Sequence, residues 1–199
     1  MLEFSGTNEM DQSREELWPY FTDPDVLADC APGCKEMRLE SPHEITAVLA
    51  VGVGSVKPEF EVEAVVTELE YPRYLELVAT GHAPKNEFEV TATMEMVERD
   101  DGGTTVEWAA TADVSGTIVS LGGRALKSVT NRLVKKYFAD MQATVEAGEG
   151  AESKLQAAPD DEEVALDVDE ASVAGEDADG GAEANDAHAD GTEATDGTD

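Results

Sequence analysis

Residues 59–66 read Glu59-Phe60-Glu61-Val62-Glu63-Ala64-Val65-Val66 and alternate charged with apolar residues through Ala64. Successive side chains of a β-strand point to opposite faces of a sheet, so this alternation predicts a half-buried strand. Its inward face carries Phe60, Val62, Ala64 and Val66, and its outward face carries Glu59, Glu61 and Glu63.

The same period of two recurs on both sides of this stretch. Further inward sets are Leu2, Phe4 and Gly6; Ile45, Ala47, Leu49, Val51 and Val53; Leu75, Leu77 and Ala79; Phe88, Val90, Ala92, Met94 and Met96; and Val106, Trp108, Ala110, Ala112 and Val114. Turn signals rich in Gly, Pro and Asp separate the runs. Closely spaced strands with short connections predict an antiparallel meander with one buried face.

Three segments have helical patterns instead. Residues 13–16 form a Ser-x-x-Glu capping box, which predicts a short helix that ends near Phe21. A second short helix or turn follows over residues 25–30. The last element is a helix from 117 to 147, which Gly122-Gly123 either kinks or splits.

The last helix has two contrasting faces. Leu126, Val129, Leu133, Tyr137 and Met141 share one face at 100° per residue, and the opposite face carries Arg124, Lys127, Arg132, Lys135 and Lys136. No acidic residue occurs between Asp113 and Asp140. The basic face is either a solvated surface paired with acidic strand residues or a docking face. As a docking face it would bind an acidic partner, anionic headgroups or the chain's own tail.

Charge divides the 199 residues into two parts. The chain has 45 acidic and 13 basic residues, with a formal net charge of −32. Residues 149–199 hold 18 of these acids, one base and none of the eleven aromatic residues. Such a composition cannot offset the entropy of ordering a chain. We therefore expect a folded domain over residues 1–147 and a disordered acidic tail over residues 148–199.

The acidity also constrains the protein's partners and environment. Nucleic-acid binding is unfavourable because phosphate contacts need concentrated Lys and Arg. The acidic excess runs over the strands as well as the tail, which favours a halophilic protein whose self-repulsion is screened by molar salt. We see no targeting or transmembrane segment, so we expect a cytoplasmic protein. Peripheral contact with the inner face of the membrane stays open.

The predicted inward positions are almost wholly apolar, which favours ligand binding over catalysis. The cavity candidates are Phe60, Val62, Leu77, Phe88, Met94, Trp108, Leu133, Tyr137 and Met141. The two methionines suit an adaptable pocket, and Trp108 and Tyr137 can each offer one polar group to a ligand. The alternative for each position is ordinary core packing.

No catalytic or cofactor-binding motif stands out. The sequence contains no nucleophile elbow, zinc-protease motif, phosphate-binding loop or dinucleotide fingerprint. Cys30 and Cys34 are spaced C-x3-C with His43 as the one further ligand nearby, which is too few for a metal site. We predict no catalytic set, no metal and no cofactor.

The order of strand, two short helices, long antiparallel sheet and long C-terminal helix resembles the helix-grip order of START-like (SRPBCC) proteins. Within that superfamily, four stretches resemble the G subunit of carbon monoxide dehydrogenase. They are Leu2-Glu3-Phe4-Ser5-Gly6-Thr7; Asp23-Pro24-Asp25-Val26-Leu27-Ala28 running into Pro32-Gly33-Cys34; Val51-Gly52-Val53-Gly54-Ser55-Val56-Lys57; and Leu121-Gly122-Gly123-Arg124. The resemblance covers residues 1–146.

The resemblance implies an α+β fold in which a curved antiparallel sheet wraps around the last helix and encloses a hydrophobic cavity. It also implies a non-catalytic accessory protein of a carbon monoxide dehydrogenase-type molybdenum hydroxylase. Such a protein would serve that enzyme's maturation, membrane recruitment or coupling to quinone. Two hypotheses follow: a carrier of a quinone or lipid-like ligand, and a START-like cyclase or dehydratase acting on a small hydrophobic substrate. A buried ionisable group with a perturbed pKa inside the cavity would favour the enzyme.

Overall fold

Seven strands form one antiparallel sheet in the computed structural model, which describes residues 1–52 and 57–159. They are β1 (Leu2–Met10), β2 (Cys34–Ser41), β3 (Glu44–Ala50), β4 (Glu59–Glu70), β5 (Tyr74–Ala83), β6 (Asn86–Glu98) and β7 (Thr104–Gly116). The spatial order is β1-β7-β6-β5-β4-β3-β2. Strands β2 to β7 form the predicted meander, and β1 joins its far edge by pairing with β7.

Local sequence signals begin and end the helices, which are α1 (Arg14–Phe21), α2 (Pro24–Cys30), the 3₁₀ turn η1 (Thr117–Leu121) and α3 (Gly123–Ala147). Both hydrogen bonds of the predicted capping box form at Ser13. The side chain of Asp23 caps α2 by accepting the Asp25 N–H at 3.2 Å. Gly122 has φ 81° and separates η1 from α3, so the glycine pair splits the predicted helix.

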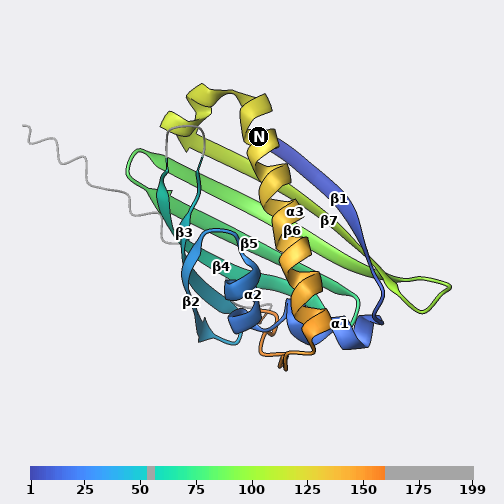
Figure 1. Cartoon of the computed structure of the whole chain (residues 1–199). Coiled ribbons are helices and arrows are strands. Elements are labelled where there is room, and N and C mark those ends of the chain that lie inside the picture. The colour runs from blue at the N-terminus through green and yellow to red at the C-terminus, as the bar shows by residue number, and fades with distance from the viewer. Residues whose placement is uncertain (53–56, 160–199) are drawn as a thin grey trace, which may run out of the picture. The chain divides into compact units, whose positions relative to one another are not determined.

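The strand register places the predicted apolar positions on one face. Phe60 lies opposite Leu49, and Met94 lies between Leu75 and Trp108 on its two neighbouring strands. Helix α3 crosses this concave face of the curved sheet (Figure 1). The predicted helix-grip fold is therefore confirmed. Residues 53–56 and 160–199 lie outside the described part of the chain. The predicted inward position of Val53, part of the family-like stretch 51–57 and most of the predicted acidic tail therefore also lie outside it.

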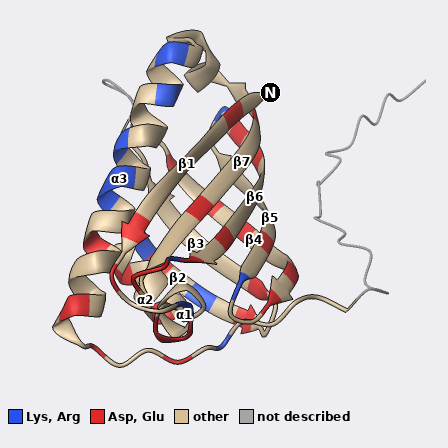
Figure 2. Cartoon of the chain, turned by 90° about the vertical axis from the view of Figure 1, so that its right-hand side faces the viewer, with Lys and Arg blue, Asp and Glu red and all other residues tan. Residues whose placement is uncertain are grey.

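The packed core lies where α1, α2 and the C-terminal half of α3 meet the sheet. Trp18 is 1% exposed there, and Met96 and Met141 are fully buried against the same cluster. The outer face of the sheet carries many acidic side chains, whereas Lys and Arg gather along the N-terminal half of α3 (Figure 2). The basic side chains of α3 and the acidic outer face of the sheet therefore lie on opposite sides of the apolar core.

The chain does not leave the domain where α3 ends. Tyr20 donates a hydrogen bond from its hydroxyl to the carbonyl oxygen of Glu149 at 2.7 Å, and Leu155 is 5% exposed within the core. We expected the tail to begin at residue 148 because its composition lacks apolar surface. Residues 149–158 instead pack against the domain, since Leu155 supplies the apolar contact that the average composition conceals.

Candidate functional site

A cavity of about 390 Å³ lies between α3 and the concave face of the sheet. Its lining comes from the sheet (Ile45, Leu49, Leu75, Leu77, Ala92, Thr93, Met94 and Trp108), from Val51 just after β3, from α3 (Leu133, Val134, Tyr137 and Phe138), from α1, α2 and the turn after them (Phe21, Leu27, Ala31 and Pro32), and from Leu155. Within the described residues, no charged side chain lines it. The site is therefore suited to apolar surface and provides no counter-charge for an ion.

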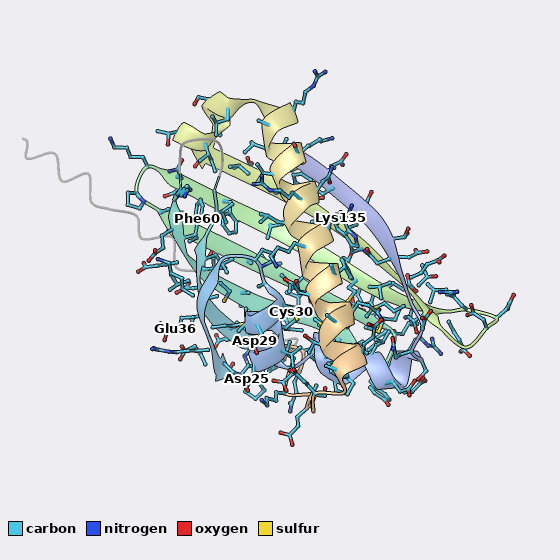
Figure 3. All side chains as sticks on the ribbon, viewed as in Figure 1. Asp25, Asp29, Cys30, Glu36, Phe60 and Lys135 are labelled. Carbon is cyan, nitrogen blue, oxygen red and sulfur yellow. The ribbon has the colours of Figure 1, made fainter. Side chains whose placement is uncertain are left out.

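Five of the cavity candidates line this space: Leu77, Met94, Trp108, Leu133 and Tyr137. Phe60, Val62 and Phe88 lie on the same sheet face but in a second apolar cluster, covered by Ile118 of η1. There the rings of Phe60 and Phe88 pack with centroids 5.2 Å apart, and Figure 3 shows Phe60 on the sheet to one side of α3. Met141 is fully buried in the main core. The shared face thus divides into cavity wall and packed core.

Trp108 offers the cavity its ring surface and not its polar group. The indole lies over Gly6 on the paired strand, where a Cβ atom would sit 2.9 Å from Nε1. Nε1 is buried and has no hydrogen-bond partner among the described residues. This close approach therefore requires a glycine at position 6. The indole N–H of Trp108, which we expected to contact a ligand, lies instead against Gly6 of β1.

Tyr137 is the one ionisable side chain among the described residues that line the cavity. Its ring packs edge-on against Phe21 and Phe138, with centroid distances of 6.3 and 5.2 Å. Burial raises the pKa of the Tyr137 hydroxyl well above its ordinary value, and the nearby Cys30 adds to the shift. The hydroxyl has no hydrogen bond to any described residue. It is therefore a neutral donor with an unused hydrogen-bonding capacity.

Sequence reasoning missed the part of the wall that comes from outside the long strands and α3. Phe21, Leu27 and Pro32 lie in the short helices and the turn after them, where no periodicity distinguishes a core residue from a cavity residue. Leu155 lies in the acidic segment, where its one signal is a large apolar side chain among small and charged neighbours.

Cys30 and Cys34 are both free thiols. Cys30 is buried on α2, on the side toward α3 (Figure 3), and its Sγ lies 3.7 Å from Thr144 Oγ1. Burial raises the pKa of both thiols. A raised pKa disfavours the reactive thiolate, so packing explains these residues.

The predicted basic face of α3 is exposed. Arg132 donates to the carbonyl oxygen of Gly52 at 3.3 Å, and Lys136 pairs with Asp140 at 2.6 Å. The three other members of the face, Arg124, Lys127 and Lys135, make no hydrogen bond or ion pair with a described residue. Pairing with acidic strand residues therefore does not account for this face. No helix in the described residues is long and apolar enough to cross a membrane.

Comparison with known proteins places the fold. A conserved protein from Geobacillus kaustophilus has a solved structure that superimposes with a TM-score of 0.71 at 24% identity, covering 76% of this chain and 99% of its own. A START superfamily protein from Mycobacterium smegmatis superimposes with a TM-score of 0.58 at 12% identity, covering 74% and 99%. At these identities the likeness establishes a START-like fold. No curated protein matches the chain.

The sequence itself identifies the family. Residues 6–146 match the family described as CoxG, the G subunit of carbon monoxide dehydrogenase, and this range is well over half of the chain. It includes every strand after the start of β1, both short helices and nearly all of α3. The chain therefore belongs to the CoxG family of carbon monoxide dehydrogenase.

Proposed function

We propose that this chain is a non-catalytic accessory protein that binds an apolar molecule, a quinone or a lipid, in the cavity beneath α3. The proposal rests on the cavity, in which about 390 Å³ of space has mostly apolar walls and includes the unbonded hydroxyl of Tyr137. Small-molecule pockets span about 300–1,000 Å³ and combine such walls with few polar groups. Burial at about 25 cal/mol per Å² of apolar surface favours uptake.

The Tyr137 hydroxyl narrows the class of ligand. Because its pKa is raised, it stays protonated through the neutral range and donates one hydrogen bond. A quinone carbonyl or an ester carbonyl accepts such a bond, whereas a carboxylate or phosphate would lose its hydration without meeting a positive charge. A neutral ligand with one oxygen at its head fits these walls best.

The same residue argues against the enzyme alternative. A START-like cyclase or dehydratase needs a group that exchanges protons near neutral pH. Tyr137 is an ionisable group with a perturbed pKa inside the cavity, but burial moves that pKa away from neutrality. The perturbation supports a hydrogen-bond donor for a bound ligand over an acid or base.

Membership of the CoxG family supports the choice of partner, a carbon monoxide dehydrogenase-type molybdenum hydroxylase. A quinone or lipid ligand is drawn from a membrane, so the protein works in the cytoplasm and contacts the inner membrane face transiently. Its role is to hold the ligand for the enzyme and not to carry out the redox step.

A fluorescence titration tests ligand binding directly. In a Trp18→Phe background, a short-chain ubiquinone analogue should quench Trp108 with one-to-one saturation. Leu133→Phe fills the cavity and should weaken binding about tenfold or more. Leu126→Phe is the matched control, because Leu126 lies seven residues earlier on the same helix face and outside the cavity lining.

Two results would overturn the binding proposal. One is quenching that stays linear with quinone concentration, as it does for free tryptophan. The other is equal weakening by Leu133→Phe and Leu126→Phe. Tyr137→Phe separates the two parts of the site, because it should weaken the quinone several-fold and leave binding of a simple alkane unchanged.

The unpaired cations favour a second, compatible function. We infer that Arg124, Lys127 and Lys135 dock the protein on an acidic surface of its partner enzyme, and Figure 3 shows Lys135 projecting outward from α3. Neutralising all three to Gln should reduce association with the purified molybdenum hydroxylase, mainly through the association rate. The control is Arg38, Arg73 and Lys85 changed to Gln, with the same change in net charge. Equal loss in both triple variants would contradict a specific docking face.

A further inference from the structure

A short segment beyond the family match contributes one residue, Leu155, to the cavity wall. Helix α3 is followed by Gly148, whose φ of 68° turns the chain back. Residues 149–158, here called the strap, then pass beside α1 and α2 at the foot of the domain (Figure 1). The match to the family stops at residue 146, before the strap begins.

Backbone hydrogen bonds fix the strap to three separate segments. The bonds are Lys154 N–H and Leu155 N–H to Thr22 O (3.0 and 3.3 Å), Gln156 N–H to Pro42 O (2.7 Å) and Ala158 N–H to Val66 O (2.8 Å). The donors lie on both sides of Leu155 as well as at Leu155 itself. The position of this side chain is therefore set by the backbone on either side of it.

A buried carboxylate adds a clamp of charged groups. Asp23 is 4% exposed and accepts from Lys154 Nζ at 2.8 Å, from the Glu152 N–H at 2.9 Å and from the Asp25 N–H at 3.2 Å. Lys154 Nζ also donates to Asp25 at 2.6 Å. The residue that caps α2 therefore also holds the strap, so movement of the strap would leave a buried carboxylate short of donors.

The clamp and the backbone bonds bring Leu155 into the cavity wall. Its side chain is 5% exposed and lines the same space as Phe21, Tyr137 and Phe138. These neighbours come from α1 and from the part of α3 next to the packed core. Leu155 therefore belongs to the part of the cavity wall that α1 and α3 also form.

We propose that Leu155 is a specificity-determining residue that sets the depth of the cavity and hence the longest apolar chain the protein accepts. The inference rests on the proposed ligand-binding function and deepens it. Each methylene that the cavity buries should raise affinity about fourfold. A chain that reaches Leu155 gains nothing from a further methylene, because the strap is bonded in place and the end wall cannot retreat.

The test is a calorimetric titration of the full-length protein with straight-chain primary alcohols of about six to fourteen carbons. Affinity should rise about fourfold per carbon and then stop rising at a break point. Leu155→Ala should move the break point two to three carbons longer, and Leu155→Phe should move it shorter. Leu155→Met keeps the volume and should leave it in place. Val26→Ala, a buried change on α2 outside the cavity lining, is the control for general loosening.

The outcomes distinguish the role of Leu155 from the proposed ligand-binding function. An identical break point in wild type, Leu155→Ala and Leu155→Phe overturns the role of Leu155 while ligand binding stands. If no alcohol binds wild type saturably, the proposed function fails. Crystal structures under xenon pressure then test separately whether Leu155 bounds the cavity. The inference then requires the xenon site to extend into the space left in Leu155→Ala. A xenon site that ends at the same point in both proteins overturns it.

Discussion

The inner face of α3 has two halves with the same chemistry and different surroundings. Met141 and Val145 are buried against α1, α2 and the sheet, whereas Leu133 and Tyr137 are half-buried and border an open cavity. An apolar helix face therefore does not dictate whether the space it covers is filled. What decides is how the opposing side chains pack: Trp18 and Met96 are buried together with Met141, whereas Trp108 and Met94 border the cavity next to Leu133 without filling it.

The largest effect on stability should come from truncating an apolar side chain of α3 to alanine, and its size should differ between the packed half and the cavity half. Met141→Ala removes a fully buried side chain and opens a new void, so it should lower the free energy of unfolding by about 3 kcal/mol. Leu133→Ala enlarges a space that already exists, so it should cost about 1 kcal/mol from lost transfer energy alone. Urea unfolding at constant salt measures both. Equal costs would show that the cavity end is as tightly packed as the core.

Salt should stabilise the whole protein without changing that difference. The acidic outer face of the sheet is screened as the Debye length falls from about 10 Å at 0.1 M to about 3 Å at 1 M salt. We expect about 2 kcal/mol of stabilisation between 0.1 and 2 M KCl, or roughly 4–8 °C in Tm for a chain of this size. Calorimetry on wild type, Met141→Ala and Leu133→Ala should give three parallel curves. A Tm that does not change with KCl would contradict the halophilic interpretation.

The residues explain why the fold was predictable and half of the site was not. Alternation at Phe60 and Met94 and the helical period at Leu133 each report which face is buried, and the structure confirms all three. Whether a residue on that face lies in the packed core or in the cavity wall depends on contacts between segments that are distant in the sequence. Phe60 is core because η1 covers it, and Leu155 is a cavity wall because Asp23 holds Lys154 beside it. Neither contact leaves a local pattern in the sequence.

A smaller loss of stability should appear at acidic pH, and it should come from the buried carboxylate of Asp23. Burial alone would raise the pKa of Asp23, but the bonds from Lys154 and from the N–H groups of Glu152 and Asp25 outweigh it and hold the pKa below its ordinary value. The resulting stabilisation is complete above the ordinary pKa of about 3.9 and is lost as pH falls through the lower folded value. Asp23→Asn keeps a capping side chain and should cost about 1 kcal/mol at pH 6.

The pH profile distinguishes this carboxylate from its exposed neighbour. Wild type should lose more stability between pH 5 and pH 2 than Asp23→Asn does, as measured by urea midpoints. Asp25→Asn is the matched control, because Asp25 binds the same Lys154 but its side chain is 84% exposed. Parallel profiles for wild type and Asp23→Asn would show that the strap clamp contributes no acid-sensitive stability.

The smallest change in stability should come from the exposed basic residues of α3. Arg124, Lys127 and Lys135 are exposed and unpaired among the described residues, so replacing all three with Gln breaks no hydrogen bond or ion pair there. The urea midpoint should stay unchanged in 2 M KCl, where charge effects along the helix are screened. Lys136→Gln breaks the pair with Asp140 and serves as a reference for a surface contact. If the triple variant lowers the midpoint more than Lys136→Gln does, these cations support the fold, and the loss of partner binding in that variant is no longer a sign of docking.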